Sequence, residues 1–104
     1  MRNPPNASSI NIVRAIRVMK ALKGHSLNGL TNKELAAALG ESPVNITRVL
    51  GSLVSEGMAQ RLETGRYAPG MQLLYIAQAF SNEMATAQAR IAELNQRVLA
   101  GSHN

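Results

Sequence analysis

The sequence predicts a mainly α-helical protein, with three short helices and a two-stranded hairpin followed by one long C-terminal helix. Three observations predict this fold. Two helix signals flank a tight turn within residues 31–58. Two short strand signals surround a glycine-containing turn over residues 58–68. Residues 71–99 carry a heptad pattern of apolar side chains and no proline or glycine.

The first helix of the central pair is predicted to begin at Asn32. Thr31 and Glu34 have the Thr-x-x-Glu spacing of a capping box, which satisfies free amides at a helix start. Gly40 stands where a left-handed residue ends a helix. The apolar face expected to pack inward consists of Leu35, Ala36 and Leu39.

The second helix of the pair follows at once. Ser42 can cap it, and Pro43 fits its first position, where no intrahelical N–H is needed. The opposite face is small or polar, which suits a DNA groove. Two helices around such a turn form a helix-turn-helix. The positions predicted to be buried are Ile46, Val49, Leu50 and Leu53.

A hairpin is predicted directly after this motif. Residues 58–62 and 66–68 have strand character, and residues 63–66 form the turn. Arg61 and Arg66 flank the turn, so the hairpin would serve as a basic wing that lies along a phosphate backbone or in the minor groove. The alternative is a surface hairpin with ordinary solvated arginines.

A helix over residues 9–23 is predicted to complete the three-helix part, and residues 24–29 to form a flexible loop. The domain organisation is thus a disordered arm at 1–8, a winged helix-turn-helix domain at 9–69, a long helix at 70–99 and a disordered tail at 100–104. The inward stripe of the first helix is predicted to contain Ile12, Val13, Ile16, Met19 and Leu22.

The long C-terminal helix is predicted to form a homodimer. Its apolar residues recur at alternating steps of four and three, which is the seam of a coiled coil. The seam consists of Leu73, Ala77, Phe80, Met84, Ala87, Ile91, Leu94 and Val98. The flanking positions are assigned to Leu74, Ala79, Ser81, Thr86, Gln88, Glu93 and Asn95. These are nearly uncharged, so a parallel and an antiparallel pair both remain open.

Composition and charge favour a nucleic-acid-binding module over an enzyme. The 104 residues include no cysteine, no aspartate and only two histidines, which leaves no plausible catalytic or metal site. Up to Pro69, nine Lys or Arg oppose four Glu, so the excess positive charge lies wholly in the winged-helix part. No cofactor is expected. Without a long apolar run or signal-peptide core, the chain is expected to be cytoplasmic and not to bind membranes.

Several segments resemble the N-terminal DNA-binding domain of IclR-type transcriptional regulators. SINIVRAIRVMKAL resembles the opening helix, GLTNKELAAALGESPVNITRVLGSLVSEGM the helix-turn-helix, and GRYAPGMQLL the end of the wing and the start of the linker helix. The resemblance implies that the second motif helix enters the major groove and that Arg48 contacts DNA. The chain departs from the family at Glu41, where an apolar residue is usual, and at Pro69, which breaks the customary pattern of the wing end. Val44 and Thr47 are not typical contact residues of the family.

Together, the motif, the wing and the resemblance give a set of predicted DNA-binding residues: Thr31, Ser42, Pro43, Val44, Asn45, Thr47, Arg48, Ser52, Arg61 and Arg66. IclR-type regulators continue into an effector-binding domain that these 104 residues lack, so no small-molecule effector is expected.

The predicted function is a sequence-specific transcriptional regulator that binds double-stranded DNA, namely a dimeric repressor of the phage or mobile-element type. Two alternatives remain open. One is a sequence-tolerant structural or replication-related DNA-binding protein. The other is a protein-interaction module that binds no DNA and recruits a helical partner.

Overall fold

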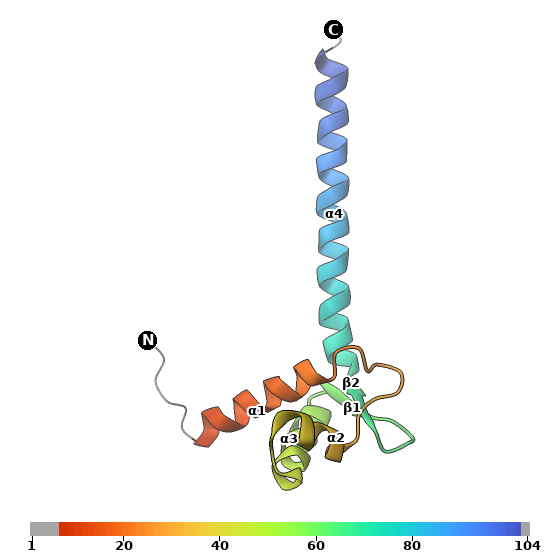
Figure 1. The fold of residues 1–104 in the computed structure, drawn as a ribbon. Coiled ribbons are helices and arrows are strands. Elements are labelled where there is room, and N and C mark those ends of the chain that lie inside the picture. The colour runs from red at the N-terminus through yellow and green to blue at the C-terminus, as the bar shows by residue number, and fades with distance from the viewer. Residues whose placement is uncertain (1–6, 103–104) are drawn as a thin grey trace. The chain divides into compact units, whose positions relative to one another are not determined.

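The computed structural model describes residues 7–102 and has the predicted fold, a winged helix-turn-helix followed by a long helix (Figure 1). The chain divides into two compact units, the first ending at Leu74 and the second starting at Tyr75. The elements in order are α1 (Ala7–Ala21), α2 (Asn32–Leu39), α3 (Pro43–Ser55), β1 (Ala59–Arg61), β2 (Tyr67–Pro69) and α4 (Met71–Ser102).

The terminal helices differ from their predicted limits. Helix α1 starts at Ala7, two residues earlier than predicted, and ends at Ala21 rather than Lys23. Helix α4 continues to Ser102, so residues 100–102 are helical and not part of a disordered tail. A single glycine near a helix end lowers helix stability without stopping the helix, and Gly101 is tolerated here. The predicted disorder of residues 1–6 and 103–104 lies outside the described residues.

The hydrophobic core of the first unit lies between α1, α2, α3 and the start of the wing. Both apolar faces predicted for the helix-turn-helix are confirmed. Leu39 packs against the core while partly exposed. The buried core residues are Val18, Leu22, Leu35, Ala36, Ile46, Val49, Leu50, Leu53 and Ala59.

The inward stripe predicted for α1 is wrong in part. Leu22, which directly follows α1, is buried as expected, but within residues 9–21 of the helix the fully buried side chain is that of Val18. The side chains of Ile12, Val13 and Ile16 are 60%, 48% and 47% exposed. Because α1 has apolar residues on nearly all sides, its periodicity does not single out one face. Contact with α2 and α3 selects the face that includes Val18.

The wing is an antiparallel pair in which Gln60 lies opposite Ala68 and Arg61 opposite Tyr67. The preceding loop is joined to it. Leu30 N donates to Tyr67 O over 2.8 Å, and Tyr67 N donates to Leu30 O over 2.7 Å. Gly29 has a φ of 69°, and a Cβ there would lie 2.6 Å from Tyr67 O. The close approach of loop and wing therefore requires glycine at this position.

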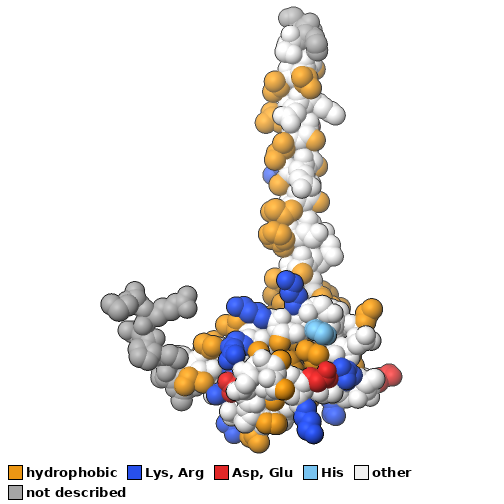
Figure 2. Space-filling model, in the orientation of Figure 1, with side chains coloured by type: hydrophobic (Ala, Val, Ile, Leu, Met, Phe, Trp, Pro, Cys, Tyr) orange, Lys and Arg blue, Asp and Glu red, His pale blue; other side chains and the backbone are white. Residues whose placement is uncertain are grey.

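Helix α4 has no buried residue in the single chain. Leu73 is half-buried and the other seven seam residues are exposed. Figure 2 shows hydrophobic side chains distributed along this helix. Over residues 7–102, no helix combines the length and apolar character needed to cross a membrane.

Candidate nucleic-acid interface

Local caps fix the start of α2 and both ends of the helix-turn-helix turn. At α2, Thr31 Oγ1 accepts from Glu34 N and Glu34 Oε1 accepts from Thr31 N, each over 3.0 Å. Gly40 ends α2 in the left-handed conformation, with φ 66° and ψ 33°. Ser42 Oγ accepts from Asn45 N over 3.2 Å and so caps α3. These caps confirm the local signals of the sequence and set where α3 begins.

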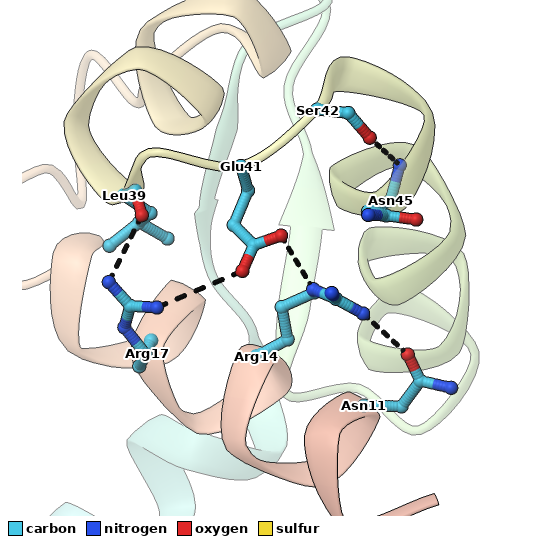
Figure 3. A network of polar contacts seen from close by, with 7 residues as sticks. All are labelled: Asn11, Arg14, Arg17, Leu39, Glu41, Ser42 and Asn45. Atoms are coloured by element: carbon cyan, nitrogen blue, oxygen red, sulfur yellow. Dashed lines mark hydrogen bonds and ion pairs between the residues drawn. The ribbon is translucent and has the colours of Figure 1, made fainter. Parts of the chain in front are cut away.

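Glu41, in the turn itself, is held by two arginines of α1 (Figure 3). Arg14 Nε donates to Glu41 Oε2 over 2.7 Å, and Arg17 Nη1 lies 3.8 Å from Glu41 Oε1. Arg17 Nη2 also donates to Leu39 O over 3.0 Å. The turn is therefore attached to α1 by an ion-pair network at the position where the resemblance predicts an apolar contact.

Asn32 joins the start of α2 to α3. Its Nδ2 donates to Pro43 O over 3.3 Å and to Thr47 Oγ1. The other carboxamide atom, Oδ1, is buried without a hydrogen-bond partner in the described structure. Thr47 is exposed, but its hydroxyl group accepts the hydrogen bond from Asn32 Nδ2 and so helps to hold the two motif helices together.

The outer face of α3 is accessible and chemically mixed. Val44 is 67% exposed. Arg48 and Ser52 are exposed beside α1, where they help to line a small hollow. Gly51, two helical turns after Val44, is exposed on the same side of α3 as Val44, and a Cβ added there would meet no atom within 4 Å. This face therefore offers one guanidinium, one apolar side chain and a flat central position to a partner.

The two wing arginines have different roles. Arg61 is exposed and makes no hydrogen bond or ion pair within residues 7–102. Arg66 is half-buried: its Nε donates to Asn28 O over 2.9 Å and its Nη2 to Gly29 O over 3.2 Å. The same Nη2 lies 2.9 Å from Glu34 Oε1. Arg66 therefore links the loop, α2 and the wing, and Arg61 is the wing guanidinium available to a phosphate.

Glu34 is the acceptor shared by the α2 cap and Arg66. Hydrogen bonding from the Thr31 backbone lowers the pKa of Glu34 below its ordinary value, with smaller contributions from the Thr31 side chain and from Arg66. The carboxylate is consequently ionised throughout the neutral range, which keeps the capping box and the Arg66 ion pair intact.

Three of the basic residues in the first unit form ion pairs within the protein, because Arg14 and Arg17 share Glu41 and Arg66 faces Glu34. Figure 2 shows Lys and Arg side chains over the winged-helix unit. Five lysine and arginine side chains between positions 7 and 74 make no ion pair within the described structure: Lys20, Lys23, Lys33, Arg48 and Arg61.

Lys33 is the candidate that the sequence prediction missed. It is exposed in the first turn of α2, next to Asn32, which contacts α3. A lysine at a helix start adds to the positive potential of free N–H groups there, which attracts phosphate. The N-terminal position of Lys33 in α2 was visible in the sequence, but its proximity to α3 was not.

The ten predicted DNA-binding residues therefore divide by local role. Five of them form hydrogen bonds within the protein, through a side chain or the backbone: Thr31, Ser42, Pro43, Thr47 and Arg66. The side chains of the other five make no hydrogen bond or ion pair within residues 7–102: Val44, Asn45, Arg48, Ser52 and Arg61.

Comparison with known proteins identifies the family of the helix-turn-helix. The family model of the IclR helix-turn-helix domain matches residues 11–63, just over half of the chain. The chain belongs to this family. Its membership supports a DNA-binding role in transcriptional regulation.

A solved structure shows the same fold as this IclR-family chain. It is the crystal structure of an IclR family transcriptional regulator from Brucella abortus, with a TM-score of 0.59 and 22% identity. The match covers 67% of this chain and 27% of that regulator, so the IclR-family chain spans about a quarter of its length. No curated protein matches the chain.

Proposed function

We propose that this chain is a sequence-specific transcriptional regulator that binds an inverted repeat in double-stranded DNA as a homodimer and represses by occluding a promoter. The observation that carries the proposal is the outer face of α3. It is accessible and bears Arg48, within a helix-turn-helix whose turn is fixed by caps and by the Glu41 network.

The side chains on α3 supply the chemistry for base recognition. The Arg48 guanidinium can bind a phosphate or the O6 and N7 atoms of guanine. The Asn45 carboxamide matches the N6 and N7 pattern of adenine, and Val44 offers apolar surface to a thymine methyl group. We therefore assign base preference to Val44 and Asn45, and a larger share of the affinity to Arg48.

Phosphate contacts are assigned to basic residues around this face. Lys33 in α2 and Arg61 in β1 are exposed and make no ion pair within residues 7–102. They come from two elements that adjoin α3 in sequence, so they can bind the backbone on either side of a helix that occupies the groove. Such contacts set affinity and its salt dependence without reading sequence.

The exposed seam of α4 supports the homodimer. Phe80 and Ile91 are 62% and 60% exposed, and the helix spans 32 residues, about 48 Å at 1.5 Å per residue. Burying such a stripe against a second copy removes apolar surface from water. Two winged helices held together also bind two half-sites, which raises the specificity of a module that alone makes few base contacts.

Selection from random duplexes with the purified chain at about 150 mM salt tests the proposal, since this salt suppresses purely electrostatic binding. An enriched inverted repeat is expected. Retention without a motif would indicate a sequence-tolerant DNA-binding protein. Folded protein that retains no duplex would indicate a protein-interaction module.

Arg48→Ala then tests the docking face on the selected duplex. We expect roughly a tenfold or greater loss of affinity, corresponding to about 1–3 kcal/mol for one strong contact. Arg97→Ala is the matched control, because it removes the same charge from α4. Equal affinity of Arg48→Ala and the parent protein would show that α3 does not dock through this face.

A further inference from the structure

We infer that two copies of α4 pair in antiparallel orientation, in a register that places Glu83 of each chain beside Arg90 of the other. The inference rests on the proposed homodimer and specifies its interface. It follows from the size of the seam residues and from the positions of the four charges on α4.

Leu74, Ser81, Gln88 and Asn95 flank the seam as assigned from the sequence, but Ala79, Thr86 and Glu93 do not, because the heptad steps place them at c positions. The steps of the seam make Ala77 and Met84 a positions and Phe80 a d position. The positions before each a residue, the g positions, are then Ile76, Glu83, Arg90 and Arg97. One flank is therefore charged and the other, at Leu74, Ser81, Gln88 and Asn95, is not.

Two of the four charges on α4 are satisfied within the helix. Arg97 Nη2 lies 2.6 Å from Glu93 Oε1. Glu83 and Arg90 make no ion pair within residues 7–102, and they lie two helical turns apart, about 10 Å, on one flank. A second helix is needed to bring a Glu83 and an Arg90 together.

Orientation decides whether these two charges meet. In a parallel pair, g positions face e positions, so Glu83 would face Gln88 and Arg90 would face Asn95, with no ion pair formed. In an antiparallel pair, g positions face g positions. Glu83 of each chain can then face Arg90 of the second copy, which forms two symmetric ion pairs.

The same antiparallel register uses the whole seam and pairs large side chains with small ones. Ala77 lies opposite Leu94, and Met84 lies opposite Ala87. A shallow hollow beside Ala87, lined also by Glu83 and Arg90, is available to the larger methionine. The remaining layers are Leu73 with Val98 and Phe80 with Ile91. A parallel pair in register would instead stack Ala77 on Ala77 and Ala87 on Ala87, leaving thin layers between bulky ones.

Neighbouring antiparallel registers are disfavoured by charge. Sliding by one heptad in one direction places Glu83 beside Glu83 of the second copy. Sliding in the other direction places Arg90 beside Arg90, and it brings Glu83 only to Arg97, which already pairs with Glu93 of its own helix. Each slide also removes layers from the ends of the seam. The pairing of Glu83 with Arg90 is thus the register without like charges opposed.

Disulfide trapping tests the orientation, since the chain has no cysteine of its own. Ala77→Cys and Leu94→Cys are prepared separately with tags of different size, mixed under reducing conditions and then oxidised. An antiparallel pair places residues 77 and 94 in one layer, so cross-linking is expected only in the mixture. In that pair the two copies of either residue are about 26 Å apart, too far for a disulfide.

A charge exchange provides an independent readout. Glu83→Arg should weaken the dimer roughly tenfold in sedimentation, because it opposes Arg90 of the second copy, and adding Arg90→Glu should restore it. Cross-linking of each single variant with itself would overturn the antiparallel pair while leaving the dimer. A dimer that gives no cross-link would remove α4 as its interface, and a monomer at micromolar concentration would overturn the proposed dimer itself.

Discussion

Arg14 Nε in α1 donates to Glu41 Oε2 in the helix-turn-helix turn over 2.7 Å, and both side chains are only 17% exposed. Glu41 directly precedes Ser42, the residue that caps α3. The ion pair therefore ties the start of the proposed recognition helix to the first helix of the domain. Arg14 Nη1 also donates to Asn11 Oδ1 over 2.9 Å, which fixes the arginine in place (Figure 3).

Replacing Glu41 with glutamine should destabilise the domain. Arg14 would lose its charged acceptor while remaining largely enclosed, so we expect a loss of about 1–2 kcal/mol in the free energy of unfolding, measured by chemical denaturation. Glu63→Gln, in the exposed wing turn, is the control and should change stability little. The double variant Arg14→Met and Glu41→Leu should recover stability, because an apolar pair needs no desolvation of charge.

Gly51→Ala should separate stability from DNA binding. The residue is in the interior of α3 with open space around it, so alanine should stabilise the domain by about 0.5–1 kcal/mol. If α3 approaches DNA closely along this face, the added methyl group should at the same time lower affinity. Thermal unfolding and DNA titration on one preparation measure both effects. Unchanged or higher affinity would place Gly51 outside the contact surface.

The two wing arginines should respond oppositely to substitution by alanine. Arg66→Ala removes its bonds to Asn28, Gly29 and Glu34, and should lower the unfolding temperature. Arg61→Ala should leave that temperature nearly unchanged and reduce the salt dependence of DNA binding by about one phosphate contact. Titrations at several salt concentrations, with unfolding curves for each variant, distinguish the roles. A reduced salt slope for Arg66→Ala at unchanged stability would contradict its structural assignment.

Glu34 should make stability depend on pH on the acid side. Its folded pKa is lowered from 4.5, so the stabilisation by its ionised form is fully present above that value. It should be lost as the pH falls through the lower folded pKa, where the carboxylate is protonated. Denaturation at a series of pH values should show the parent protein and Glu34→Gln converging in acid. A constant difference between them would mean that the charge of Glu34 contributes nothing.

Short-range signals predicted much of the central motif. Thr31 with Glu34, Gly40 and Ser42 with Pro43 act over three residues or fewer, and the structure has each cap where the sequence placed it. The buried face of α3 followed from its periodicity, because most of the large apolar residues of that helix lie on one side.

Contacts between distant residues could not be predicted in the same way. The bonds from Arg66 to Asn28 and Gly29 span more than 35 positions, and the Leu30–Tyr67 bridge also joins segments far apart in sequence. A basic residue in a turn looks the same in sequence whether it faces solvent or a carbonyl group. The sequence therefore predicts the same phosphate-binding role for Arg61 and Arg66, and only the contact between the loop and the wing distinguishes them.

The sequence by itself determined the local elements, from the caps of the motif helices to the heptad seam of α4, because these depend on near neighbours along the chain. Tertiary structure decided which face of α1 is buried, which arginines form ion pairs and which remain available. It made Val18 a core residue and left Ile16 exposed. The physical reason is that burial and ion pairing depend on what packs opposite a residue, and for α1 and the wing those partners are remote in sequence.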